Sequence, residues 1–258
     1  MESAVERIEP RFVERVWGSF HLEPWYEEQG RRIGEVWFEA GAVLIKFLFT
    51  TEALSVQVHP DDAYARAHHE GVGKTEMWHV LRAEPGARIA VGFRETVSAE
   101  RVREAAAGGT IEGLLAWHGV EAGDTFFVPA GTVHALGAGL AVCEIQQSSD
   151  ITYRMYDYGR GRELHLEHGL AVADFGPHPG KCLARDHLLA DCGYFRVERW
   201  EMREDWVCDR DLCMVVLAGE GIVGGAEFRS GEVWKIPAGV RIEPCGEALV
   251  LRVYGPAY

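Results

Sequence analysis

The chain has 258 residues, of which 47% are hydrophobic and 26% are charged, and its formal net charge is −14 at pH 7. This composition is typical of a folded globular protein with one large domain or two smaller ones, and the acidic balance argues against nucleic-acid binding, which requires a basic face. No apolar run approaches the roughly 20 residues that a membrane helix needs, so we also expect no membrane association.

The amino-terminal 30 residues predict an irregular, aromatic-rich segment. Its first residues are acidic and lack the basic and apolar regions of a secretory signal peptide, so we expect a cytoplasmic protein. None of the six cysteines belongs to a Cys-x-x-Cys pair, and we expect free thiols rather than a zinc knuckle.

Strand-like runs rich in β-branched and aromatic residues follow one another through the rest of the chain. They cover 33–38, 42–49, 55–60, 77–81, 88–93, 123–129 and 140–146, and then 195–200, 212–217, 233–237 and 248–254. A helical insertion at about 98–117 interrupts them, with Ser98 as its N-cap and a second short helix over 110–117. Many short strands with Gly/Pro turns predict a mainly β protein built as a sandwich or barrel.

One sequence pattern occurs twice. Segments 123–131 and 231–239 both read glycine, acid, four residues, Pro-Ala-Gly. His134 follows the first copy, and Ile242 stands at the corresponding place after the second. The clearest linker is the Gly/Pro-rich segment 175–180. We therefore predict two related β modules, of which only the first carries chemistry.

Four polar residues of the first module form a candidate metal site. Gln57 and His59 are two residues apart in a short strand-like run, so their side chains share one face. Glu76 and His134 lie on two other strand-like segments. Two imidazoles and one carboxylate are common ligands of a catalytic divalent metal, and Gln57 would add a neutral oxygen. A single strand histidine is more often structural, so the hypothesis depends on the four together.

Four longer stretches, 42–62, 73–78, 123–135 and 144–158, carry a family resemblance. In them the chain resembles the type I mannose-6-phosphate isomerases, in particular their short bacterial form. The resemblance runs from about residue 10 to residue 170, and the later module fits in outline only. It implies two cupin-type (jelly-roll) β modules. The first, 1–173, would be the catalytic metal-binding domain with the helical insertion, and the second, 174–258, a smaller cupin-like domain without metal ligands.

The resemblance also implies a chemistry. The family's enzymes are zinc-dependent aldose–ketose isomerases that interconvert D-mannose 6-phosphate and D-fructose 6-phosphate through an enediol, and we expect one zinc per chain on the same four residues. The family's catalytic groups correspond to Arg154, Glu144 and Lys74. Its substrate-binding groups correspond to Ser55, Lys46, Lys74 and Arg154. The expected partner is a small sugar phosphate, and we expect a monomer or a homodimer.

The residues alone leave other roles open for the three cations. Lys46 could face outward at a strand edge, and Lys74 could be a solvated loop charge. Arg154 could form a salt bridge to Asp150 or Asp157.

The general base is also open. Glu144 is the first choice, because burial near a metal could raise its proton affinity, and its alternative role is to hold a ligand or Arg154 in place. Lys74, Asp150 and His79 are the other candidates. Two other functions also compete: an iron-dependent cupin oxygenase and a sugar-binding cupin without turnover.

Overall fold

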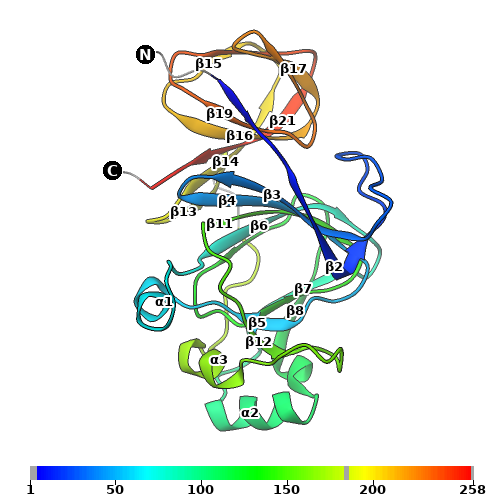
Figure 1. Ribbon diagram of the computed structural model, residues 1–258, viewed down its shortest axis with the longest axis vertical. Coiled ribbons are helices and arrows are strands. Elements are labelled where there is room, and N and C mark those ends of the chain that lie inside the picture. Colours follow the sequence, from blue (N-terminus) through cyan, green and yellow to red (C-terminus); the bar gives the residue numbers. More distant parts are fainter. Residues whose placement is uncertain (1–4, 183–185, 257–258) are drawn as a thin grey trace.

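Four antiparallel sheets make up the protein, stacked one above another with helices at one end (Figure 1). The computed structural model describes residues 5–182 and 186–256. Most elements of this described part are strands, so the chain is mainly β, as the sequence predicts. No helix in this described part is both long and apolar enough to cross a membrane.

Two sheets form the first module. Its large sheet has the order β2 (Arg11–Ser19), β3 (Ile33–Ala40), β4 (Val43–Thr50), β11 (Leu140–Gln147), β6 (Glu76–Ala83) and β9 (Thr125–Val128). Its small sheet has the order β12 (Tyr153–Tyr156), β5 (Val56–Val58), β10 (His134–Leu136), β7 (Arg88–Phe93) and β8 (Leu115–Gly119). An apolar core that includes Leu48, Trp78 and Val91 fills part of the space between them.

Two further sheets form the second module. The larger has the order β1 (Glu6–Ile8), β19 (Val233–Ile236), β16 (Leu212–Ala218), β21 (Ala248–Tyr254), β14 (Arg196–Met202) and β13 (Leu188–Asp191). The smaller has the order β15 (Trp206–Val207), β20 (Arg241–Pro244), β17 (Glu220–Val223) and β18 (Ala226–Arg229). A second apolar core, with Phe228, Trp234 and Val250, lies between these sheets.

The helices lie at the end of the molecule remote from the second module, apart from α1 (Asp62–His68) at its side (Figure 1). α2 (Ala99–Ala107), the 3₁₀ helix η1 (Ile111–Leu114) and α3 (Leu166–Val172) pack on the outer face of the small sheet of the first module. Ser98 caps α2 as predicted, because its hydroxyl accepts a hydrogen bond from the main-chain N–H of Arg101 at 3.2 Å.

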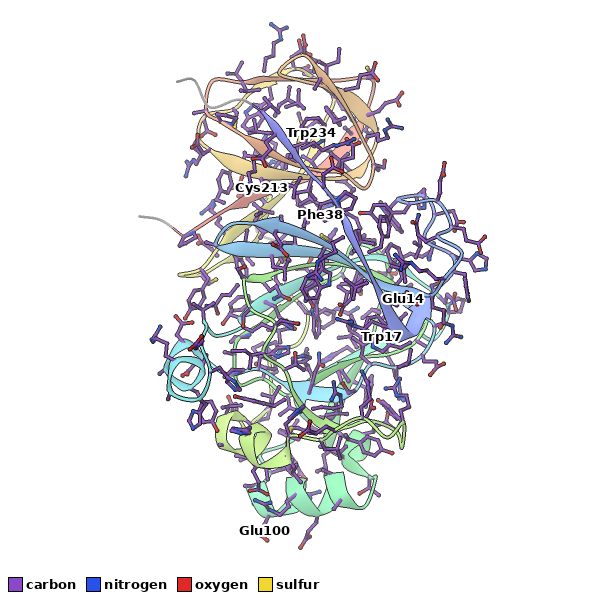
Figure 2. All side chains as sticks on the ribbon, viewed as in Figure 1. Glu14, Trp17, Phe38, Glu100, Cys213 and Trp234 are labelled. Carbon is purple, nitrogen blue, oxygen red and sulfur yellow. The ribbon has the colours of Figure 1, made fainter. Side chains whose placement is uncertain are left out.

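Side-chain alternation along β4 leaves one face wholly apolar, while Lys46 and Thr50 share the other with two leucines. Ile45 and Phe47 join the core between the two modules, where Figure 2 also places Phe38. Lys46 points into the first module and is buried. Because β4 lies between β3 and β11, the alternative of an outward-facing Lys46 at a strand edge is wrong.

Two local predictions are corrected, and one helix was missed. Part of the amino-terminal segment that was expected to be irregular forms the nine-residue strand β2. The predicted second helix over 110–117 is the short η1 followed by β8, which pairs with β7. α3 was not predicted at all.

The repeated pattern has the same shape in both modules. β9 and β19 are each flanked by glycines in the left-handed region, and the glycines of the two Pro-Ala-Gly turns, Gly131 and Gly239, have φ of 89° and 85°. His134 begins the strand after the first turn, whereas Ile242 lies in the strand after the second, buried in the apolar core. The second module therefore has a hydrocarbon where the first has an imidazole.

The amino-terminal strand crosses between the modules. β1 is the edge strand of the larger sheet of the second module and pairs with β19, with Ile8 opposite Val233. β2 then enters the first module (Figure 1). The expected linker also makes contacts, since Phe175 stacks on Phe93 and Pro177 bridges to Gly92. The domain boundary near residue 174 stays a prediction. β1 precedes this boundary in the sequence, but it pairs within a sheet whose other strands all follow the boundary.

Candidate active site

The four residues predicted as ligands meet in the first module. Gln57 lies in β5, His59 follows it directly, Glu76 begins β6 and His134 begins β10. β10 pairs with β5 with His134 opposite Gln57. The main-chain N–H of Gly131 donates to the main-chain carbonyl of His59 at 2.9 Å, so the turn that precedes His134 is bound to the backbone of the other histidine.

Three of these residues form a compact buried centre. Glu76 Oε2 lies 3.5 Å from His59 Nε2, and Glu76 Oε1 lies 3.5 Å from His134 Nε2. The candidate ligand atoms all lie within 4.8 Å of one another. Within the described residues, His59 Nε2 and both Glu76 oxygens are buried without a hydrogen-bond partner. The nearby ammonium group of Lys74, 3.4 Å from Glu76 Oε2, compensates this oxygen in part, and a bound cation would compensate all three.

The opposite nitrogen of each imidazole is held by the main chain. His59 Nδ1 lies 3.0 Å from the carbonyl of Ile151, and His134 Nδ1 lies 2.9 Å from the carbonyl of Thr132. A carbonyl can only accept a hydrogen bond, so each Nδ1 carries the proton and each Nε2 presents a lone pair to the centre. This is the tautomer that a metal ligand needs.

Burial controls the protonation of the centre. It lowers the pKa of His134 to about 4 and holds the pKa of His59 well below its ordinary value. Burial also raises the pKa of Glu76 to about 8, although the ammonium group of Lys74 acts to lower it. Both imidazoles are therefore neutral near pH 7 and available as ligands, and a cation at the centre would favour the ionised form of Glu76.

Gln57 reaches the same centre through its amide group. Gln57 Nε2 lies 3.2 Å from His134 Nε2, and the hydroxyl of Ser55 donates to Gln57 Oε1 at 3.4 Å. A half-turn of the amide about its terminal bond exchanges nitrogen for oxygen at this place. Gln57 can thus offer a neutral oxygen beside the three buried ligands.

A cavity of about 440 Å³ adjoins the centre. Five residues predicted from the sequence line it besides Gln57: Ser55, Lys46, Lys74, Glu144 and Arg154. Among the described residues, five cationic side chains and four carboxylates line the cavity, so its charge is close to balanced, although the net charge of the chain is −14. A local cluster of this kind can bind an anion in spite of the acidic total.

The carboxylate of Glu144 forms an ion pair with one neighbour and accepts a hydrogen bond from another. Lys46 Nζ lies 3.1 Å from Glu144 Oε1, and the indole N–H of Trp78 donates to Glu144 Oε2 at 2.9 Å. Burial opposes ionisation of Glu144, but the ammonium groups of Lys46 and Lys74 outweigh it and hold the pKa of Glu144 below its ordinary value. The expectation of a raised proton affinity for Glu144 is therefore wrong, because the neighbouring cations outweigh the effect of burial.

Lys74 links the cavity to the buried centre. Its ammonium nitrogen lies 3.4 Å from Glu76 Oε2 and is itself buried. Burial alone would lower the pKa of Lys74, but the carboxylates of Glu76 and Glu144 raise it above its ordinary value. Lys74 is a buried cation, and the alternative of a solvated loop charge is wrong.

Arg154 lacks an acidic partner among the residues that the structure describes. It lies opposite Gln57 across β12 and β5, and its guanidinium donates to the carbonyl of Glu163 at 2.6 Å. Its Nε is buried without a partner, and burial lowers the pKa of Arg154. Asp157 is paired instead with Arg160 and Arg162. The described contacts therefore leave donors of Arg154 free to bind an anion.

The two remaining base candidates, Asp150 and His79, lie in different parts of the first module. Asp150 lines the cavity. His79 does not, because it lies on the face of β6 that turns toward the second module, where its Nδ1 lies 2.9 Å from the hydroxyl oxygen of Thr125. Burial, with a contribution from Arg199, lowers the pKa of His79 to about 4.

Sequence reasoning missed one wall of the cavity. Arg15 from β2, Glu35 from β3 and Arg162 also line it. Glu35 and Trp37 alternate with apolar residues along β3, and that pattern was a sign of polar inward groups. Arg15 carried no such sign, because its segment was interpreted as irregular.

Two stacked jelly-roll modules, with a buried pair of histidines and a carboxylate in one of them, define a cupin protein with a candidate metal centre. No family model matches the sequence. The mannose-6-phosphate isomerase of Streptococcus mutans is 38% identical over an alignment of 216 residues, and the match covers 78% of this chain and 68% of that protein. The mannose-6-phosphate isomerase ManA of Bacillus subtilis is 32% identical over an alignment of 256 residues, and the match covers 90% of this chain and 81% of that protein. The chain belongs to the mannose-6-phosphate isomerase family.

Solved structures agree with this assignment. The crystal structure of mannose 6-phosphate isomerase from Bacillus subtilis matches 98% of this chain and 100% of its own, with a TM-score of 0.85 and 25% identity. A putative mannosephosphate isomerase from Archaeoglobus fulgidus matches with a TM-score of 0.83 over 98% of each chain, at 18% identity. The second comparison supports the fold alone.

Proposed function

We propose that this chain is a zinc-dependent aldose–ketose isomerase that interconverts D-mannose 6-phosphate and D-fructose 6-phosphate through an enediol intermediate. One observation carries the proposal: the buried His59, Glu76 and His134 lie beside a cavity that Lys74 and Arg154 line. A metal centre next to anion-binding groups suits a phosphorylated sugar. The relatives that carry this enzyme name cover most of the chain.

The donor set fits one zinc ion per chain. Two imidazole nitrogens and a carboxylate oxygen are common zinc ligands, and the neutral amide oxygen of Gln57 would leave the ion with a net positive charge. When bound, zinc would act as a Lewis acid that favours the build-up of negative charge on the oxygens at C1 and C2 of the sugar.

The substrate phosphate needs a cation that is not already neutralised. Lys46 is paired with Glu144 and Lys74 with Glu76, whereas Arg154 has no carboxylate partner in the described chain. A guanidinium also presents a fork of donors that matches a phosphate. Arg154 is therefore the proposed phosphate or oxyanion contact, and Lys46, Lys74 and Ser55 complete the substrate-binding groups.

The proton transfer between C1 and C2 requires a base within reach of the sugar. Glu144 remains the proposed base, since its lowered pKa keeps it ionised at neutral pH. Both of its oxygens already bind, one to Lys46 and one to Trp78, which weakens it in this role. Lys74 and Asp150 line the same cavity and are the alternatives.

One assay separates the competing functions. The purified chain is stripped with a chelator and reloaded with zinc or with iron, and the formation of fructose 6-phosphate from mannose 6-phosphate is measured. The proposal requires turnover that the chelator removes and zinc restores. Binding of the sugar phosphate without turnover would favour a sugar-binding cupin, and oxygen uptake with iron alone would favour an oxygenase. The cytoplasmic location and the monomeric or homodimeric state stay predictions.

A further inference from the structure

One row of side chains crosses the entire large sheet of the first module. The register pairs residues on successive strands from β2 to β9, in the order Arg11, Trp37, Lys46, Glu144, Trp78 and Phe126. The row begins at an exposed arginine and ends at a fully buried phenylalanine. Its central pair, Lys46 and Glu144, lines the cavity.

Trp37 is the neighbour of Lys46 on the side away from Glu144. The ammonium nitrogen of Lys46 lies 4.6 Å from the centre of the Trp37 ring, within the range of a cation–π contact. Both side chains are buried. Lys46 is thus held on one side by a carboxylate and on the other by an aromatic face, and its flexible four-carbon stem is confined between them.

The ring of Trp37 is itself fixed. Its indole N–H donates to Glu35 Oε2 at 2.8 Å, and the guanidinium of Arg15 lies 2.7 Å from the same oxygen. Gly34 permits this arrangement, because a Cβ atom at that position would come within 2.5 Å of Arg15 Cβ. Arg15 and Glu35 both line the cavity, so an anchored chain of contacts runs along its wall to Lys46.

The second module contains a glutamate–tryptophan pair that matches Glu35 and Trp37, but among the described residues no lysine lies over its indole ring. The indole N–H of Trp234 donates to Glu232 at 3.0 Å, and the two residues have the same spacing as Trp37 and Glu35. Trp234 is as buried as Trp37, with exposed fractions of 6% and 7%. Figure 2 shows Trp234 inside the second module, remote from Glu14 and Trp17, which line the cavity. A glutamate–tryptophan pair of this kind can therefore be structural only.

We infer that Trp37, anchored by Glu35 and Arg15, is a positioning residue that holds the ammonium group of Lys46 in the substrate cavity. The inference rests on the proposed function for its catalytic consequence. Trp37 lies on β3, three strands away from β6, which carries Glu76, and it does not itself line the cavity, so it acts through Lys46. Without the ring, the Lys46 side chain samples more rotamers, and its ammonium group spends less time in the position where it can contact the substrate.

The test uses the zinc-loaded full chain with two variants at each tryptophan. Trp37→Leu removes the ring, whereas Trp37→Phe keeps an aromatic face and loses the N–H; Trp234→Leu and Trp234→Phe are the matched controls. Lysine-specific NMR is well suited, because the chain has only four lysines, Lys46, Lys74, Lys181 and Lys235. Lys46→Arg assigns the Lys46 signal, and KM and kcat for mannose 6-phosphate are measured in parallel.

The inference predicts a defined pattern. In the parent, the ring current of Trp37 displaces the Lys46 side-chain signals; Trp37→Leu abolishes the displacement and Trp37→Phe retains part of it. Trp37→Leu raises KM about tenfold, the factor expected for a desolvated cation–π contact, with a smaller change in kcat. Trp37→Phe recovers most of this loss. The Trp234 variants lower stability without moving either readout.

Two results would overturn the inference. One is a Trp37→Leu chain whose Lys46 signals and KM stay within twofold of the parent. The other is an equal rise of KM in Trp234→Leu. Failure of the proposed function looks different: the zinc-loaded parent then has no isomerase activity, while the Lys46 signals still report whether Trp37 holds the lysine in place.

Discussion

Lys46 on β4 and Glu144 on β11 are direct cross-strand partners, and the ammonium nitrogen of one lies 3.1 Å from a carboxylate oxygen of the other inside the cavity. Both side chains are buried, so each charge depends on the other for compensation. The pair is neutral in total. It therefore adds no net charge to the cavity, and Lys46 can contact a substrate only as a local donor, while Arg154 is the cavity cation without a carboxylate partner in the described chain.

Breaking this pair from one side should destabilise the protein strongly. Glu144→Gln or Lys46→Met leaves a buried charge without its partner, and we expect a loss of about 3–5 kcal/mol in the free energy of unfolding. The double variant should lose much less than the sum. Urea unfolding of the four proteins measures the coupling, and strictly additive losses would show that the pair is not coupled.

Removing Arg154 should separate catalysis from metal binding. Arg154→Ala is expected to lower turnover by about a hundredfold or more, because a preorganised donor to an anion is lost. Bound zinc should stay near one per chain, measured by metal analysis after dialysis. Arg162→Ala is the matched control, since Arg162 lines the same cavity but is paired with Asp157. Loss of zinc from Arg154→Ala would assign Arg154 to the metal centre instead.

Removing the charge of Glu76 should abolish tight zinc binding. Glu76→Gln replaces an anionic ligand, and the affinity should fall by more than the roughly hundredfold that loss of an outer hydrogen-bond partner can cost. Glu35→Gln provides the comparison, because Glu35 is another buried carboxylate of the cavity and is bound by Arg15 and Trp37. Competition with a chelator of known affinity measures both. Equal affinities would contradict the metal assignment.

His79 should make stability depend on pH below neutrality. Its folded-state pKa of about 4 lies under the ordinary 6.5, so the unfolded chain takes up a proton first as the pH falls. The neutral imidazole contributes its full stabilisation above pH 6.5, and about 3 kcal/mol of that is lost as the pH falls to 4. His79→Gln should flatten this part of the pH profile in urea unfolding. Parallel profiles for parent and variant would refute the assignment.

The strands and the clustering of the four candidate metal ligands were accessible from the sequence for a physical reason. Alternation has a fixed period of two, so Gln57 and His59 must share a face wherever the strand lies. Turns marked by Pro and Gly also identified the strand before His134. The resemblance added the proposed roles of Arg154 and Glu144, which spacing alone could not provide.

The errors have physical causes as well. β2 was missed because Glu14 and Arg15 interrupt its apolar pattern, and their partners lie on other segments of the chain. β8 was interpreted as a helix because it begins with two good helix formers, Leu115 and Ala116, and pairing with β7 overrides that preference. The ionisation of Glu144 depends on Lys46, a partner almost 100 residues away, which no local pattern reveals.

The pairing of β1 with β19 sets an order of events during synthesis. Ile8 leaves the ribosome about 225 residues before its partner Val233, an interval on the order of ten to forty seconds at usual translation rates. During that time the sheet that β1 completes does not exist. The first module can assemble around its own strands, but the joint between the two modules closes only after nearly the whole described chain has emerged, so a ribosome stalled before β19 would hold a chain with its amino-terminal strand unpaired.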